Sequence, residues 1–122
     1  MSVTPYLFLE DANAAIDFYV KAFGAEEQLR LPAPDGRKTM HAVLALAGGT
    51  VFLSDMDPGE KPASVAVALG LDSARAVDAL AARVAEAGAT ITFGPEDMPW
   101  GDRFAQITDP FGHRWMLSAP RG

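Results

Sequence analysis

Two histidines and one carboxylate at the end of an apolar run are the residues of this sequence best suited to acid–base or metal chemistry. His41 lies in the run Thr-Met-His-Ala-Val, and Asp55 ends the run Val-Phe-Leu-Ser-Asp. In an aromatic cavity Asp55 could act as a general base, and His41 and Asp55 could both contribute to a metal site. A metal site needs three or four convergent ligands, so the alternative for His41 is a strand or pocket histidine held by hydrogen bonds. The alternative for Asp55 is a cap on the turn that begins at Asp57, and His113, after Gly112, is assigned to turn chemistry.

A second group of candidates lies in the segment Met-Pro-Trp-Gly-Asp-Arg-Phe near the C-terminus. Trp100 is costly to expose and could close over a ligand, with Arg103 as partner of an anion or carbonyl and Phe104 beside it. The alternative is that Trp100 fills the core or a dimer interface while Arg103 pairs with Asp102 or another acid.

Two aromatic residues near the N-terminus, Tyr6 and Phe8, could stack on a flat ligand or belong to the core. The spacing of a Ser–His–Asp triad, a phosphate-binding glycine loop and a helical zinc motif are all absent from the sequence. The candidate ligand-binding residues are therefore Tyr6, Phe8, His41, Asp55, Trp100, Arg103 and Phe104.

Composition narrows the function classes further. There is no cysteine, which excludes disulfides, thiolate metal sites and a cysteine nucleophile. The net charge of −6 argues against nucleic-acid binding and is compatible with a cationic ligand. No apolar run reaches the roughly 18 residues of a membrane helix, and the N-terminus lacks signal-peptide character, so we expect no membrane partner and a cytoplasmic location.

A repeat of about half the chain must position these residues. Ala-Ile-Asp at 15–17 corresponds to Ala-Val-Asp at 76–78, and each segment follows an apolar strand-like run and ends at Gly-Ala. The repeat predicts a duplicated supersecondary unit. We expect one domain over 1–122, with modules at 3–56 and 64–119 and a linker at 57–63.

Periodicity predicts the order βαβββ in each module. Asp11 is expected to cap the first helix and Gly24 to end it, while Asp72 or Ser73 caps the second. Gly48-Gly49 is expected to form a hairpin turn. The strands are predicted at 4–10, 26–31, 39–47, 50–56, 64–71, 89–93, 103–108 and 114–118, with a loop at 94–102.

These motifs resemble the vicinal oxygen chelate superfamily, which contains glyoxalases, bleomycin-resistance proteins and extradiol dioxygenases. The resemblance is carried by P-Y-L-F-L-E-D, A-I-D-F-Y, F-G-A, K-T-M-H-A, L-S-D and M-P-W-G-D-R-F…D-P-F-G-H-R-W, and is closest to the PhnB-like branch. It implies an α+β fold in which two βαβββ modules form a curved, incomplete barrel. The concave face would enclose a ligand cavity, lined by Thr4, Tyr6 and Phe8, and the protein would be a homodimer.

The resemblance also implies where metal ligands would stand. In metal-dependent members one His or Glu lies on each of four strands, and the corresponding positions here are Thr4, Leu53, Ser64 and Met116. Leu53 has no donor atom and a thioether suits hard divalent ions poorly. We therefore expect no cofactor and no usual metal centre.

The first functional hypothesis is a small-molecule-binding protein that sequesters its ligand, as bleomycin-resistance proteins do, without catalysis. The alternative is a metal-dependent lyase, isomerase or dioxygenase with an atypical site at His41 and Asp55. A scaffold with a filled cavity is a third hypothesis.

Overall fold

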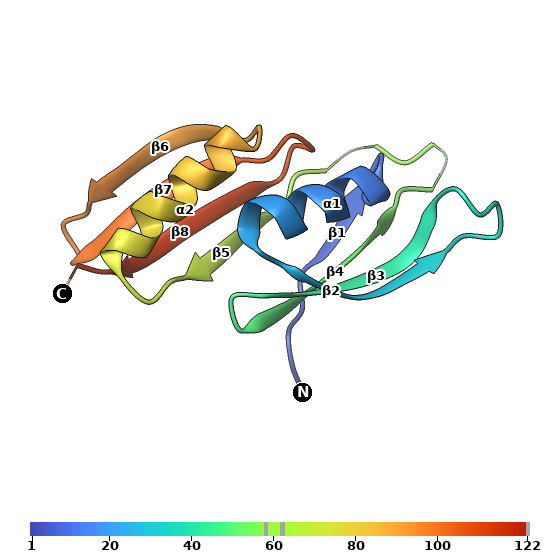
Figure 1. Cartoon of the computed structure of the whole chain (residues 1–122), viewed down its shortest axis with the longest axis horizontal. Coiled ribbons are helices and arrows are strands. Elements are labelled where there is room, and N and C mark those ends of the chain that lie inside the picture. Colours follow the sequence, from blue (N-terminus) through green and yellow to red (C-terminus); the bar gives the residue numbers. More distant parts are fainter. Residues whose placement is uncertain (58, 62, 122) are drawn as a thin grey trace. The chain divides into compact units, whose positions relative to one another are not determined.

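The computed structural model describes residues 1–57, 59–61 and 63–121, so Pro58 and Pro62 of the expected linker lie outside the described residues. The chain divides into two compact units, Met1–Ala63 and Ser64–Gly122. Each unit contains one four-stranded sheet with a single helix packed across one face (Figure 1). In the described part of the chain, no helix combines the length and apolar character needed to span a membrane.

The two units repeat one topology, which confirms the prediction of duplicated βαβββ modules. The first contains β1 (Tyr6–Leu9), α1 (Ala12–Phe23), β2 (Glu26–Pro32), β3 (Thr39–Leu46) and β4 (Gly49–Asp55), with sheet order β1-β4-β3-β2. The second contains β5 (Ala66–Gly70), α2 (Ala74–Glu86), β6 (Thr90–Asp97), β7 (Asp102–Thr108) and β8 (Arg114–Pro120), with sheet order β5-β8-β7-β6. In each sheet the first and last strands of the module pair in parallel and the other pairs are antiparallel.

The helix termini follow from their capping residues. The Asp11 carboxylate accepts the amide of Ala14 at 3.1 Å, and Gly24 ends α1 in the left-handed conformation at φ 71°. In the second module Ser73, rather than Asp72, is the N-cap. The separation along the chain between the two N-caps, Asp11 and Ser73, is therefore one residue longer than the separation between the matching segments at 15–17 and 76–78.

Burial alternates along the strands as expected for sheets covered on one face. In the first module the helix-facing side chains include Leu7, Leu9 and Leu53, each no more than 1% exposed. In the second module Trp115 and Leu117 are fully buried, and Val65, just before β5, is only half-buried. Each fully buried side chain of this size stabilises the fold by roughly 1.5–3 kcal/mol.

Two local predictions were wrong. The β3–β4 turn is formed by Ala47 and Gly48, with φ of 52° and 77°, because Leu46 pairs with Gly49. Both central residues have positive φ, as in a type I′ hairpin turn.

The segment 94–102 is mostly strand rather than loop, because β6 continues to Asp97. Gly94, at φ 69°, lies where the register against β7 shifts, and pairing resumes at Glu96. Pro95 is tolerated because β6 is an edge strand, where a missing amide leaves no partner unpaired. The connecting turn is short, and the Met98 amide donates to the Asp102 carbonyl at 2.8 Å.

Candidate functional site

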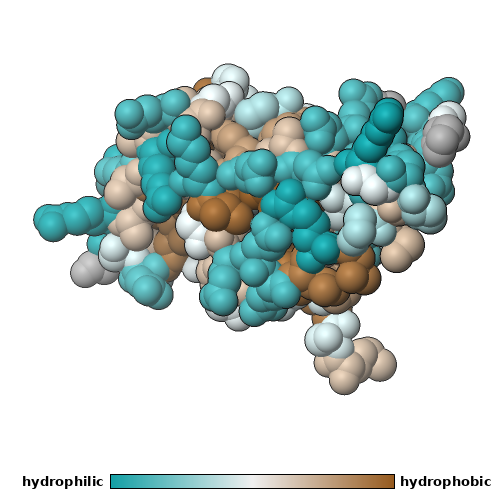
Figure 2. All heavy atoms as spheres, turned by 45° about the vertical axis from the view of Figure 1, so that its right-hand side comes forward, coloured by the Kyte–Doolittle hydropathy of each residue, from teal (hydrophilic) through white to brown (hydrophobic). Residues whose placement is uncertain are grey.

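The face of the first sheet that α1 leaves uncovered is apolar and aromatic. One row crosses all four strands, because Tyr6 pairs with Phe52, Phe52 with Val43, and Val43 with Leu29. These side chains alternate with the helix-facing core, so they point to the opposite side. Figure 2 shows apolar residues gathered in patches among hydrophilic ones, one of them where the N-terminal segment projects.

Four rings on this face form one cluster, defined here as Tyr6, Phe8, His41 and Phe52. The Tyr6 and Phe8 rings stack with centroids 4.7 Å apart, and the His41 and Phe52 rings meet edge-on at 5.1 Å. The Tyr6 hydroxyl lies 3.3 Å from His41 Nδ1, a hydrogen bond whose direction depends on the histidine tautomer. The structure thus brings together three of the sequence-predicted site residues: Tyr6, Phe8 and His41.

A pocket of about 350 Å³ continues from this cluster at Phe8. It lies where β1 and β4 end, beside the segment that leads into β3. Its lining residues are Phe8, Ala33, Pro34, Lys38, Thr39, Met40, Ser54, Asp55, Met56, Asp57 and Glu60.

Asp55 lines this pocket, but its carboxylate is already occupied by backbone donors. Oδ1 accepts the amide of Ala12, the first residue of α1, at 2.9 Å, and Oδ2 accepts the amide of Thr39 at 2.6 Å. The expectation that Asp55 caps the turn at Asp57 is therefore wrong. That turn is closed by the Glu60 carboxylate, which accepts the Asp57 amide at 2.7 Å. Asp55 instead ties the start of α1 and the start of β3 to the end of β4.

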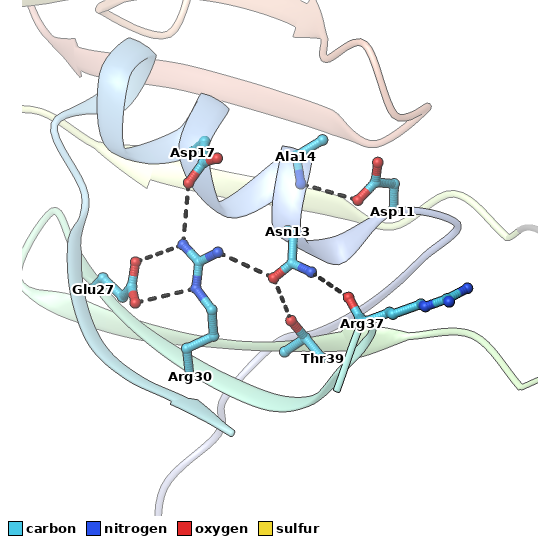
Figure 3. Close-up of polar contacts among 8 residues, drawn as sticks. All are labelled: Asp11, Asn13, Ala14, Asp17, Glu27, Arg30, Arg37 and Thr39. Carbon is cyan, nitrogen blue, oxygen red and sulfur yellow. Dashed lines mark hydrogen bonds and ion pairs between the residues drawn. The ribbon is translucent and has the colours of Figure 1, made fainter. Parts of the chain in front are cut away.

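A polar network behind the pocket fixes the same segment (Figure 3). The Asn13 side-chain oxygen accepts from the Thr39 hydroxyl at 2.7 Å and from Arg30 at 3.1 Å, while its amide nitrogen donates to the Arg37 carbonyl at 2.9 Å. Arg30 also forms ion pairs with Glu27 on β2 and with Asp17 on α1. These contacts, that with Glu27 foremost, raise the pKa of the Arg30 guanidinium. The segment that contributes Lys38 and Thr39 to the pocket wall is thus anchored to α1 through Asn13, and Arg30 ties β2 to the same residue.

In the second module, Arg103 lies on the helix side of its sheet. Its guanidinium binds both oxygens of Asp78 on α2, at 2.9 and 3.2 Å, and reaches Asp97 on β6 at 3.3 Å. The contact with Asp78 is the main cause that raises the pKa of Arg103. Of the two alternatives for Arg103, these contacts match the one in which it pairs with an acid. The acids are Asp78 and Asp97 rather than Asp102.

Phe104 points the other way, toward the uncovered face of the second sheet. Its ring lies 5.9 Å from that of Phe93. A row across this face joins Ala68, Met116, Gln106 and Phe93 through successive pairs. Trp100, in the β6–β7 turn, is 65% exposed and so does not fill the core of its own module.

The side chains of the motif Asp-Pro-Phe-Gly-His-Arg-Trp stabilise the turn before β8. Asp109, 3% exposed, accepts the amides of Phe111 and His113 and the indole N–H of Trp115 at 2.9 Å. His113 Nδ1 accepts the amide of Val65 at 3.0 Å, which joins the turn to the start of β5. The assignment of His113 to turn chemistry agrees with these contacts.

Two of the positions at which the resemblance implies metal ligands, Leu53 and Met116, can be compared in the two sheets. Leu53 lies in the helix-facing core, so Phe52, its neighbour on the uncovered face, is the counterpart of Met116. Neither carries a hard donor atom. No cluster of three or more His, Cys, Asp or Glu residues suited to a metal ion occurs among residues 1–57, 59–61 and 63–121.

Sequence reasoning missed several residues of the uncovered faces, namely Phe52, Met40, Phe93 and Gln106. The signal for Phe52 was present in Val-Phe-Leu-Ser-Asp, where alternation puts Phe52 and Leu53 on opposite faces. Met40 carried no such signal, because the register between β2 and β3 shifts beside it.

Comparison with known proteins agrees with this architecture. A protein of Mycobacterium tuberculosis (strain H37Rv) is 45% identical over 128 residues, covering 98% of this chain and 74% of the relative. The crystal structure of TioX from Micromonospora sp. ML1 superposes with a TM-score of 0.79 at 28% identity, covering 100% of this chain and 98% of that chain. The PhnB protein of Bacillus cereus shares the fold, with a TM-score of 0.73 at 19% identity over 98% of this chain and 99% of its own. Residues 3–117 match the family model described as the glyoxalase/bleomycin resistance protein/dioxygenase superfamily, and the chain belongs to that superfamily.

Proposed function

We propose that this protein binds a flat, largely apolar small molecule on the uncovered face of its first sheet and does not transform it. The observation that carries the proposal is the ring cluster of Tyr6, Phe8, His41 and Phe52, which lies on the face of its sheet opposite α1. Phe8 is 47% exposed, and leaving such a ring in water forgoes its burial energy. A contiguous apolar face with a neighbouring pocket is typical of a binding site.

The chemistry of the surrounding polar groups supports binding more than catalysis. Both Asp55 oxygens accept backbone amides, so this carboxylate is committed to holding the fold. His41 Nδ1 is within hydrogen-bond distance of the Tyr6 hydroxyl, which orients the imidazole inside the ring cluster. The protein would then act by sequestering its ligand without the usual metal centre of the superfamily.

The test begins with a thermal-shift screen of planar aromatic compounds. Any compound that stabilises the protein is then titrated into the parent protein, Phe8→Ala and Val20→Ala. We expect Phe8→Ala to weaken binding about tenfold, because a stacked ring supplies on the order of 1 kcal/mol beyond its buried area. Val20→Ala, an exposed apolar residue on α1, is the matched control and should bind as the parent does.

The alternative function, a metal-dependent lyase, isomerase or dioxygenase, makes an opposite prediction. It requires a stoichiometric divalent metal that survives dialysis and is lost in His41→Ala. Elemental analysis of the purified protein measures this directly, and retained metal would contradict the sequestration proposal.

A further inference from the structure

We infer that the ligand carries a positive charge next to its aromatic portion, and that the pocket beside Phe8 receives the charged group. This inference rests on the proposed function, since the aromatic portion must lie on the same uncovered face. The pocket volume of about 350 Å³ is at the small end of the range for ligand sites. It therefore suits a substituent or single ring rather than a whole large ligand.

The apolar wall of the pocket favours a cation. Phe8 stacks on Tyr6 at 4.7 Å, which holds its ring, yet 47% of the residue remains exposed. Met40, on the same wall, is 54% exposed. The electron-rich face of a phenylalanine ring attracts an ammonium group, and the attraction grows as water is excluded.

The charges around the pocket point the same way. Three lining residues are acidic, Asp55, Asp57 and Glu60, and one is basic, Lys38. Each Asp55 oxygen already accepts a backbone amide, and one oxygen of Glu60 accepts the Asp57 amide. The exposed Asp57 carboxylate and the second Glu60 oxygen can still accept hydrogen bonds from a ligand.

The Lys38 side chain is exposed as well, and its long stem lets the ammonium group stay in water. The acidic groups of the pocket lining thus outnumber its one basic group. An anion entering the pocket would meet both carboxylates, whereas a cation would be paired by them.

The test uses one ring system in three charge states: 1-naphthylmethylammonium, 1-naphthylmethanol and 1-naphthoate. Each is titrated into the isotope-labelled full chain, and amide shifts in the NMR spectrum give both the site and the affinity. We expect the ammonium to bind about fivefold to tenfold more tightly than the alcohol, and the carboxylate to bind more weakly than both. The advantage of the ammonium should shrink as salt is added.

Paired variants separate charge from packing. Asp57→Asn with Glu60→Gln should abolish the preference for the ammonium and leave binding of the alcohol unchanged. The matched control, Asp72→Asn with Glu86→Gln, removes two exposed carboxylates that do not line the pocket and should keep the preference. Equal binding of alcohol and ammonium at the amides around Phe8 would overturn the cationic ligand while leaving the proposed function intact. Failure of all three compounds to shift those amides would overturn the proposed function as well.

Discussion

The Asp55 carboxylate holds the pocket wall and the start of α1 together, so its removal should destabilise the protein strongly. Its two oxygens accept the Ala12 amide at 2.9 Å and the Thr39 amide at 2.6 Å. A hydrogen bond to a charged group contributes about 1.5–3 kcal/mol, and partial burial here favours the lower end of that range. Asp55→Ala leaves both amides without this acceptor and should lower the free energy of unfolding by about 3 kcal/mol. Asp55→Asn retains one acceptor oxygen, so about half of that loss is expected.

Denaturant unfolding monitored by circular dichroism measures these losses, and the melting temperature of Asp55→Ala should fall by roughly 10 °C. The matched control is Asp72→Ala, an exposed carboxylate just before α2 whose loss should cost less than about 0.5 kcal/mol. Amide hydrogen exchange adds a local readout, because Ala12 and Thr39 should lose protection in the variants. A loss from Asp55→Ala no larger than that of the control would refute the structural role assigned to this carboxylate.

Three further outcomes test other parts of the fold. Gly94→Ala should destabilise by more than about 2 kcal/mol, because a Cβ there would collide with the backbone oxygen of Phe104 on β7. Gly48→Ala has open space and should cost only about 1 kcal/mol, and chemical denaturation compares the two variants. Backbone amides of the β2–β3 loop, that of Lys38 first and then that of Arg37, hold the pKa of Asp35 below its ordinary value. The contribution of this carboxylate to folding stability is therefore complete above about pH 4 and is lost as pH falls through the depressed pKa. An NMR titration that finds an ordinary pKa would contradict this. A double-mutant cycle between Arg103 and Asp78 should give a coupling of about 1 kcal/mol or less, since both side chains are partly exposed.

The module order could be predicted from the sequence because each element carries a local signal. Asp11 and Gly24 mark the ends of α1, and the apolar alternation of Leu7 and Leu9 places their side chains against that helix. The extent of β6 could not be predicted in the same way. Gly94 and the following proline are local signals for a loop, and it is pairing with β7 that overrides them.

The candidate site was predicted in its aromatic part and missed in its polar part. Tyr6, Phe8 and His41 lie on strands whose alternation is readable from the sequence, so their shared face follows from the strand order. The partners of Asp55 are distant in the chain: Ala12 is 43 residues away and Thr39 is 16. No sequence pattern indicates such contacts, because they exist only once α1 and β3 have packed.

Duplication itself bears on where the function lies. In both modules an Asp on the helix pairs with an Arg on the sheet: Asp17 with Arg30, and Asp78 with Arg103. The Asp residues stand at matching positions of the repeat, whereas Arg30 is on β2 and Arg103 is on β7, the counterpart of β3. Both pairs join helix to sheet, and neither requires a ligand to explain it.

The uncovered faces of the two sheets carry different side chains at corresponding positions. The row Tyr6, Phe52, Val43 and Leu29 in the first module corresponds in register to Ala68, Met116, Gln106 and Phe93 in the second. Packing against the helix constrains only one side of each sheet, so the other side is free to differ. Tyr6 and Phe52 stand where the second module has Ala68 and Met116, so the stacked aromatic surface belongs to the first module. This is why the binding proposal is made for the first sheet alone.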